Sequence, residues 1–285
     1  MRIAYFTAGT IGAGHLAHGI AILRSLKRSG CAATYQMFGP KLPYQVAQLD
    51  NYQVVDIHPV ELREPLKVAE SALVLALEGF RPDLLLVDMF WAPLRYILPR
   101  LQCEAWLLIR CCPPQWFIGS AEMPFAPEQF QRIIGIEPLN YSLLHEEIDP
   151  IVICNPDECK PKTALREHLR VPADQPLVVV TQAGLPGECE AICPKLETGE
   201  LFRFNMLAPN TLFPLCEWLP GADAIYCGTG YNSFWEAVWL GYANRTHFTP
   251  FGRHIDDQAW RLTYCQKHMM KENGADILAR WIKGS

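Results

Sequence analysis

The segment from Ala222 to Gln258 constrains the fold of this 285-residue chain more than any other. It begins with a short apolar run typical of a buried strand, and Gly228 and Gly230 follow in a turn. Apolar residues then recur at helical spacing from Tyr231, so the order is strand, glycine turn and helix. Backbone N–H groups and the positive end of a helix dipole would meet at this turn. The segment therefore predicts a site for an anion such as a diphosphate.

Polar side chains at the start of this helix extend the predicted anion site. Asn232 and Ser233 offer hydrogen-bond donors, and Glu236 follows at i+4 and i+3 from them, on the same helix face. A carboxylate can accept hydrogen bonds from two adjacent hydroxyl groups such as those of a ribose. The pattern thus predicts recognition of phosphate and ribose, while Trp235 and Trp239 are expected in the buried face of the helix.

A second glycine loop lies near the N-terminus. Arg2 to Thr7 reads as a buried strand, Gly9 to His15 reads GTIGAGH and contains Gly12 and Gly14, and apolar residues at helical spacing follow. These are the parts of the first unit of a doubly wound sheet. A dinucleotide-binding unit would need an acid about 20 residues further on. The first acidic residue is Asp50, so that alternative is disfavoured.

His15 and Asp88 are the candidate catalytic residues. His15 would lie just after a parallel strand, at the crevice where open α/β sheets bind ligands, and an imidazole can take a proton from an attacking hydroxyl group. Pro82 to Met89 reads PDLLLVDM, a buried strand that ends in Asp88. We expect Asp88 to orient His15. In the alternative interpretation Asp88 caps the next helix and His15 bonds only to backbone.

Taken in order, these segments resemble the GT-B glycosyltransferases that use UDP-sugars, among them the bacterial peptidoglycan GlcNAc-transferase and plant secondary-metabolite glucosyltransferases. In plant-type relatives an aspartate pairs with the loop histidine, which matches Asp88 and His15. The glycine turn and helix start hold the pyrophosphate, a glutamate holds the ribose and an acid-amide pair faces the sugar hydroxyls. The resemblance assigns these three roles, respectively, to Gly228, Gly230, Asn232 and Ser233, to Glu236, and to Asp257 and Gln258.

The resemblance implies an α/β, GT-B-like chain with two Rossmann-like domains whose parallel sheets face each other across a cleft. Residues 1–155 would form the acceptor domain. Residues 156–285 would form the nucleotide-sugar domain, with the last helix returning to the first. The implied reaction moves a hexosyl or N-acetylhexosaminyl group from a UDP-sugar to an acceptor hydroxyl or amine, with inversion and without a cofactor.

Two departures from the family pattern leave other functions open. Gly228 stands where relatives commonly carry His or Arg, and the stretch between Thr181 and Ala222 is short for a complete second domain. A subunit that binds a nucleotide-sugar or serves as a scaffold without catalysis therefore remains an alternative. So does a UDP-sugar epimerase or hydrolase of the same fold.

Composition excludes some partners. The net charge is −5 and no basic stripe is present, so nucleic acid is not expected. No apolar run approaches the roughly 20 residues that span a bilayer, and we expect a cytoplasmic protein, with peripheral membrane contact left open. No D-x-D pair that would hold a metal on a diphosphate is present, so no metal is expected. The 11 cysteines include no C-x-x-C pair and are expected as reduced, buried thiols.

Overall fold

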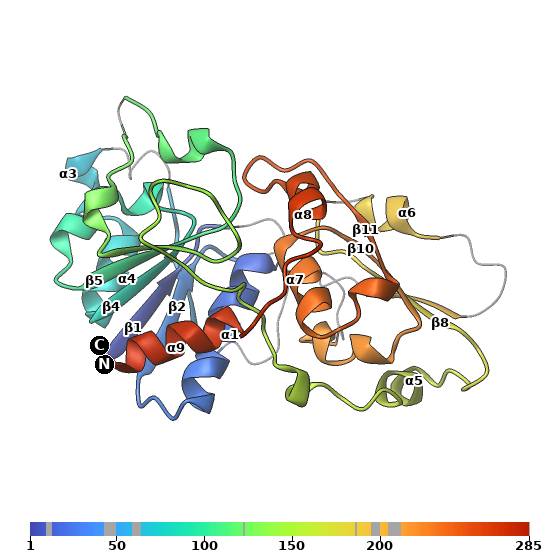
Figure 1. Cartoon of the computed structure of the whole chain (residues 1–285). Helices are drawn as coiled ribbons and strands as arrows, with labels where there is room; N and C mark the ends of the chain where they lie inside the picture. The colour runs from blue at the N-terminus through green and yellow to red at the C-terminus, as the bar shows by residue number, and fades with distance from the viewer. Residues whose placement is uncertain are drawn as a thin grey trace.

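The computed structural model describes residues 1–9, 13–42, 50–58, 64–121, 123–185, 187–194, 200–204 and 212–284. In these ranges two parallel sheets lie side by side (Figure 1). This confirms the predicted two-sheet α/β fold. Within the same ranges, no helix combines the length and the apolar character needed to cross a bilayer.

The first sheet has the strand order β3-β2-β1-β4-β5-β6-β7, all parallel. Its strands are β1 (Arg2–Phe6), β2 (Thr34–Gly39), β3 (Tyr52–Val54), β4 (Leu84–Asp88), β5 (Glu104–Ile109), β6 (Arg132–Gly135) and β7 (Glu146–Glu147). The order reverses between β1 and β4, because the chain continues to β2 on one side and to β5 on the other. Loops that leave neighbouring strands at this point diverge and open a crevice.

Helices cover both faces of the first sheet (Figure 1). They are α1 (Gly14–Arg28), α3 (Pro65–Val68), α4 (Ala72–Phe80) and, from the end of the chain, α9 (Gly274–Gly284). Apolar residues of α1 and α9 share one core with the sheet, and those of α4 share the other. Short 3-10 helices connect the strands: η1 (Ala92–Leu94), η2 (Leu98–Arg100), η3 (Pro114–Phe117) and η4 (Pro127–Gln129).

The second sheet has the order β11-β10-β8-β9. Its strands are β8 (Leu177–Thr181), β9 (Glu200–Phe204), β10 (Ala224–Gly228) and β11 (Thr246–Thr249). Its helices are α5 (Ala164–Leu169), α6 (Glu188–Ile192), α7 (Tyr231–Trp239) and α8 (Gln258–Tyr264), with the 3-10 helices η5 (Pro156–Glu158), η6 (Leu215–Glu217), η7 (Leu219–Gly221) and η8 (Ala243–Arg245). The strand, glycine turn and helix predicted from Ala222 are β10 and α7.

Helix α7 joins the two halves of the molecule, the first of which contains the first sheet and the second of which contains the second sheet. Its buried residues Tyr231, Phe234 and Trp235 belong to the same core as α1. The Tyr231 hydroxyl donates to the carbonyl oxygen of Ile136 at 2.6 Å and accepts from the backbone N–H of Ile151 at 2.7 Å. Both partners lie in the first half of the chain, so α7 is held against the first sheet by apolar packing and by paired polar groups.

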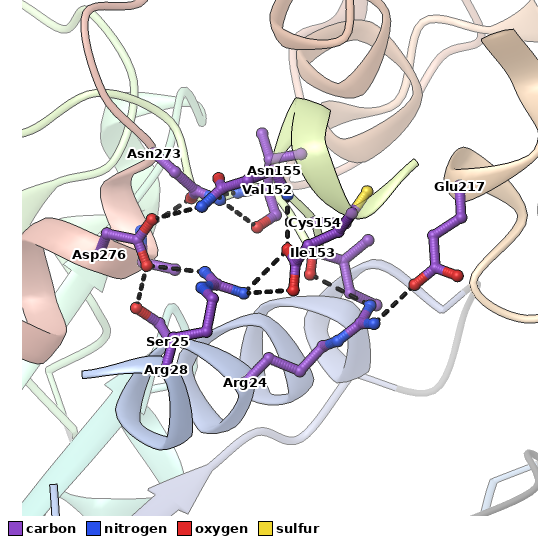
Figure 2. Close-up of polar contacts among 12 residues, drawn as sticks. Arg24, Ser25, Arg28, Val152, Ile153, Cys154, Asn155, Glu217, Asn273 and Asp276 are labelled. Carbon is purple, nitrogen blue, oxygen red and sulfur yellow. Dashed lines mark hydrogen bonds and ion pairs between the residues drawn. The ribbon is translucent and has the colours of Figure 1, made fainter. Parts of the chain in front are cut away.

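A polar network holds α9 against α1 and against the segment where the chain crosses to the second sheet (Figure 2). Asp276 accepts from Arg28 at 2.7 Å and from the Asn155 side chain at 2.8 Å, and it also bonds to Ser25. The Asn273 amide donates to the carbonyl oxygen of Val152 at 2.8 Å. The outward and returning crossings of the chain are therefore bonded to each other.

Candidate active site

A cavity of about 470 Å³ lies between the two halves. Its volume is within the range usual for small-molecule sites. The first half contributes Gly9, Gly14, His15, Phe90, Arg110 and Trp116, and the second half contributes Gln182, Gly230, Asn232, Ser233, Glu236, Arg253, Asp256 and Gln258, among others. Seven of the residues predicted from the sequence line this one cavity: Gly14, His15, Gly230, Asn232, Ser233, Glu236 and Gln258. Gly12 lies outside the described residues.

His15 and Asp88 are in direct contact. His15 lies in the first turn of α1 and Asp88 is the last residue of β4, so the topology brings two strand ends together. Nδ1 of His15 is 2.9 Å from Oδ2 of Asp88, and Asp88 is fully buried behind the imidazole. His15 lines the cavity, whereas Asp88 does not. This is the arrangement in which an aspartate fixes the tautomer of a histidine base.

Two further side chains, which the sequence analysis did not single out, bond to the same oxygen of Asp88. Nδ1 of His18 is 3.0 Å away, and the Tyr5 hydroxyl donates at 2.5 Å. Within the described ranges, no group forms a hydrogen bond with Oδ1 of Asp88. Burial opposes ionisation of Asp88, yet the two histidines hold its pKa well below the usual value. Asp88 is therefore a carboxylate stabilised by three donors.

The same cluster has residue types that also bind metals. The ligand atoms of His15, His18 and Asp88 lie within 4.8 Å of one another. Among the described residues, these three form the cluster of His, Cys, Asp or Glu side chains that is close enough to hold a metal ion. Hydrogen bonds from both Nδ1 atoms to Oδ2 account for the observed distances without an ion.

Arg110 faces the other side of the His15 ring. It follows β5, is 7% exposed, and its Nη2 lies 3.2 Å from Nε2 of His15. Burial lowers the pKa of His15, Asp88 raises it and Arg110 lowers it, and the net result is a pKa below 6.5. The imidazole is therefore neutral near pH 7, as a general base requires.

Of the four residues predicted to bind phosphate at the start of α7, three line the cavity and the fourth, Gly228, does not. Gly230 and Ser233 line the cavity, and Asn232 donates from Nδ2 to the carbonyl oxygen of Gly14 at 3.1 Å. Gly228 is not part of the lining, and its N–H donates to the Gln182 side chain at 3.1 Å. A Cβ atom on Gly228 would come within 2.5 Å of that side chain. Gly228 thus gives room to Gln182.

Of the predicted acid-amide pair, Gln258 lines the cavity and Asp257 does not. Asp257 is exposed, and its side chain caps α8 by accepting from the N–H of Trp260 at 2.9 Å. Gln258 lines the cavity and accepts from the N–H of Phe251 at 2.9 Å. The acid that lines the cavity is the neighbouring Asp256, which is 6% exposed.

Asp256 belongs to a buried charge network. It accepts from Arg261 at 2.7 Å, and Arg261 also bonds to Glu137 of the first half at 2.9 and 3.1 Å. Burial opposes ionisation of Asp256, but Arg261 and Arg110 hold its pKa below the usual value. The segment Arg253–Asp256, which lines the cavity, is thereby tied to the first half of the molecule.

Glu236 lines the cavity one turn into α7, as predicted. Burial raises its pKa to about 8, although a hydrogen bond with Cys216 opposes this shift. A carboxyl group with this pKa is mainly protonated at pH 7 before a ligand binds.

No protein-family model and no curated protein sequence matches the chain. Solved structures do. The glycosyltransferase SsfS6 of Streptomyces sp. SF2575 has a TM-score of 0.54 at 12% identity, over 100% of this chain and 95% of that one. The spinosyn rhamnosyltransferase SpnG with spinosyn aglycone has a TM-score of 0.54 at 15% identity, over 100% and 89%.

UGT2 of Phytolacca americana, complexed with UDP-2fluoro-glucose and pterostilbene, has a TM-score of 0.52 at 13% identity, over 99% and 89% of the two chains. The chain has the GT-B fold. At these identities the likeness concerns the arrangement of the chain. The cavity between the two halves has His15 on one wall and the start of α7 on the other.

Proposed function

We propose that this protein is a glycosyltransferase that moves a sugar from a nucleoside diphosphate sugar to a hydroxyl or amine of an acceptor. UDP is the nucleotide that we expect. The observation that carries the proposal is His15, which is bonded to Asp88 and lines the same cavity as the start of α7. A neutral base and an anion-binding helix terminus thus share one cavity.

In the proposed reaction the acceptor oxygen attacks the anomeric carbon of the donor sugar. Nε2 of His15 takes the proton of the acceptor group, while the bond between the anomeric carbon and the diphosphate oxygen breaks. Asp88, bonded to Nδ1 of His15, stabilises the imidazolium that forms. The N–H groups and the dipole at the start of α7 stabilise the charge of the departing diphosphate. A single displacement of this kind inverts the anomeric centre.

Two observations support the expected donor class: the residues that line the cavity, and the ligands of solved structures with this fold. Gly230, Ser233 and Glu236 line the cavity in the order expected for phosphate and ribose. Among solved structures with this fold, SsfS6 is described in complex with thymidine diphosphate, and UGT2 with UDP-2fluoro-glucose. We therefore place the nucleoside diphosphate at α7 and the acceptor beside His15, Phe90 and Trp116.

The test is a calorimetric and thermal-shift screen of UDP, TDP, GDP and their sugars, followed by an assay for release of the nucleoside diphosphate with a panel of phenolic, alcohol and amine acceptors. A ligand at 100 times its Kd stabilises the folded protein by about 2.7 kcal/mol, which such a screen detects. Binding together with acceptor-dependent release supports the transferase, and we expect it to survive dialysis against EDTA. Binding without turnover would instead identify a binding subunit. Release without an acceptor would identify a hydrolase, and sugar interconversion an epimerase.

A further inference from the structure

Arg110 is a buried cation whose position the proposed reaction does not explain. The guanidinium donates from Nη2 to Nε2 of His15 at 3.2 Å, and its Nε has no hydrogen-bond partner among the described residues. An N–H group can donate to Nε2 only if that nitrogen carries a lone pair, so the proton of His15 is on Nδ1, facing Asp88. The lone pair that would accept the proton of an acceptor hydroxyl is therefore occupied by Arg110.

The charge of Arg110 also lacks a direct counterion in the part of the chain that the structure describes. The other arginine that lines the cavity, Arg253, is paired with Glu188 at 2.6 Å. The buried Arg261 is paired with Glu137 and Asp256 at 2.9 and 2.7 Å. No carboxylate of the described residues comes within ion-pair distance of Arg110, although it acts on Asp256 through space. A buried cation without a partner is costly, and an anion in the cavity would offset that cost.

The surroundings of Arg110 indicate where such an anion would lie. Its Nη1 is 3.9 Å from the position that a Cβ atom on Gly14 would take, and the carbonyl oxygen of Gly14 bonds to Asn232 in the first turn of α7. The guanidinium is thus close to the helix terminus that favours negative charge. His15, on its other side, is neutral, and Asp256 is already paired with Arg261.

We propose that Arg110 binds an anionic oxygen group of a substrate, and that this binding draws the guanidinium away from Nε2 of His15. The diphosphate of the donor is the favoured source of the anion, because Arg110 lies beside the start of α7. A carboxylate on the acceptor has the same chemistry and is the other source. The inference rests on the proposed function and extends it: the base becomes available for proton transfer only when the anion is in place.

Two readouts test this proposal on the full chain: binding by calorimetry, and the pKa of the His15 imidazole by NMR, assigned with His15→Gln. The probes are inorganic pyrophosphate, UDP, uridine and benzoate. In the parent protein, the bound anion should raise the His15 pKa, because it offsets the charge of Arg110 that lowers this pKa. Uridine, which lacks the anion, should leave it unchanged. This titration requires no variant to fold.

Arg110→Gln should weaken binding of the anionic probe about 10- to 100-fold, the usual effect of losing a charge-assisted hydrogen bond. Arg110→Lys, which keeps the charge but not the planar fork, should give a smaller loss. The double variant Arg253→Gln/Glu188→Gln is the matched control: it removes a guanidinium from the same cavity together with its counterion, so the local net charge is unchanged and binding should change little.

The outcomes distinguish the diphosphate of the donor from a carboxylate of the acceptor as the source of the anion. They also distinguish failure of the Arg110 proposal from failure of the donor proposal. Dependence of UDP and pyrophosphate on Arg110 identifies the diphosphate, and dependence of benzoate alone identifies a carboxylate of the acceptor. If no nucleotide binds but pyrophosphate or benzoate still depends on Arg110, the donor proposal fails while the anion site stands. If UDP binds equally well to the parent and to Arg110→Gln, and no anion changes the pKa of His15, the role of Arg110 is refuted while the donor proposal survives.

Discussion

A Cβ atom on Gly9 would lie 2.6 Å from Cδ2 of His15, so this glycine provides the space in which the imidazole lies. The ring is confined on another side by Phe90, whose centroid is 5.0 Å away. We expect Gly9→Ala to displace His15 by up to about 1 Å and to lower transfer by up to about 100-fold, since misplacement of about 1 Å can have that effect. UDP affinity should be nearly unchanged. An unaltered rate would mean that His15 does not need this position.

His15 and His18 form a matched pair, because both bond through Nδ1 to the same oxygen of Asp88 and only His15 lines the cavity. His15→Gln should lower the rate of transfer by about 10² to 10⁴, the usual contribution of a positioned base. His18→Gln should lower the free energy of unfolding by about 1 to 3 kcal/mol through the loss of a buried hydrogen bond, with a much smaller effect on rate. Equal rate losses in the two variants would assign His15 a structural role.

The pH profile of transfer should report the pKa of His15. Its folded pKa lies below 6.5, so the base is lost only as the pH falls through that lower value, and the acid limb of kcat/KM should lie below pH 6.5. Asp88 raises this pKa, so Asp88→Asn should move the acid limb to still lower pH while it decreases the maximum rate. A limb that moves to higher pH in Asp88→Asn would contradict the assignment.

Glu236 should make recognition of the ribose depend on pH. Its pKa is raised to about 8, so at pH 7 only about one tenth of the molecules carry the carboxylate. Because the ionised form accepts from the two ribose hydroxyls, the preference for UDP over 2′,3′-dideoxy-UDP should increase by up to about tenfold from pH 7 to pH 9. In Glu236→Gln this preference should be small and constant. Parallel pH dependences of the two ligands in the parent would remove Glu236 from the ribose site.

The neighbouring acids Asp256 and Asp257 should have different effects. Asp257→Ala removes the cap of α8 and should lower the free energy of unfolding by about 0.5 to 2 kcal/mol, with little change in UDP-sugar affinity. Asp256→Asn changes a buried partner of Arg261 that lines the cavity, and should lower both stability and affinity. Calorimetry with UDP and a UDP-sugar checks both. A selective loss of the sugar contribution in Asp257→Asn, which keeps a capping side chain, would restore Asp257 to the sugar site.

The sequence contained enough to predict the two sheets and the contact between His15 and Asp88. Both residues follow apolar runs, and the carboxyl ends of neighbouring parallel strands meet at one edge. Arg110 gave the same signal, since it follows the apolar strand β5, and it could have been predicted to lie at this edge. The pairing of Gly228 with Gln182 could not, because it depends on how the loop after β8 folds. The same holds for Glu137, whose partner Arg261 lies 124 residues away.

The packing of α9 on α1 has a consequence for synthesis of the chain. Ser25 and Asp276, which bond across this contact, are 251 residues apart. At the usual 5 to 20 residues per second, a ribosome needs about 10 to 50 s to pass from one to the other. During that time the apolar residues of α1 that share a core with α9, among them Ile22 and Leu26, lack the part of that core that α9 will supply. The nascent first half therefore exposes a surface on which chaperones can act until α9 has been synthesised.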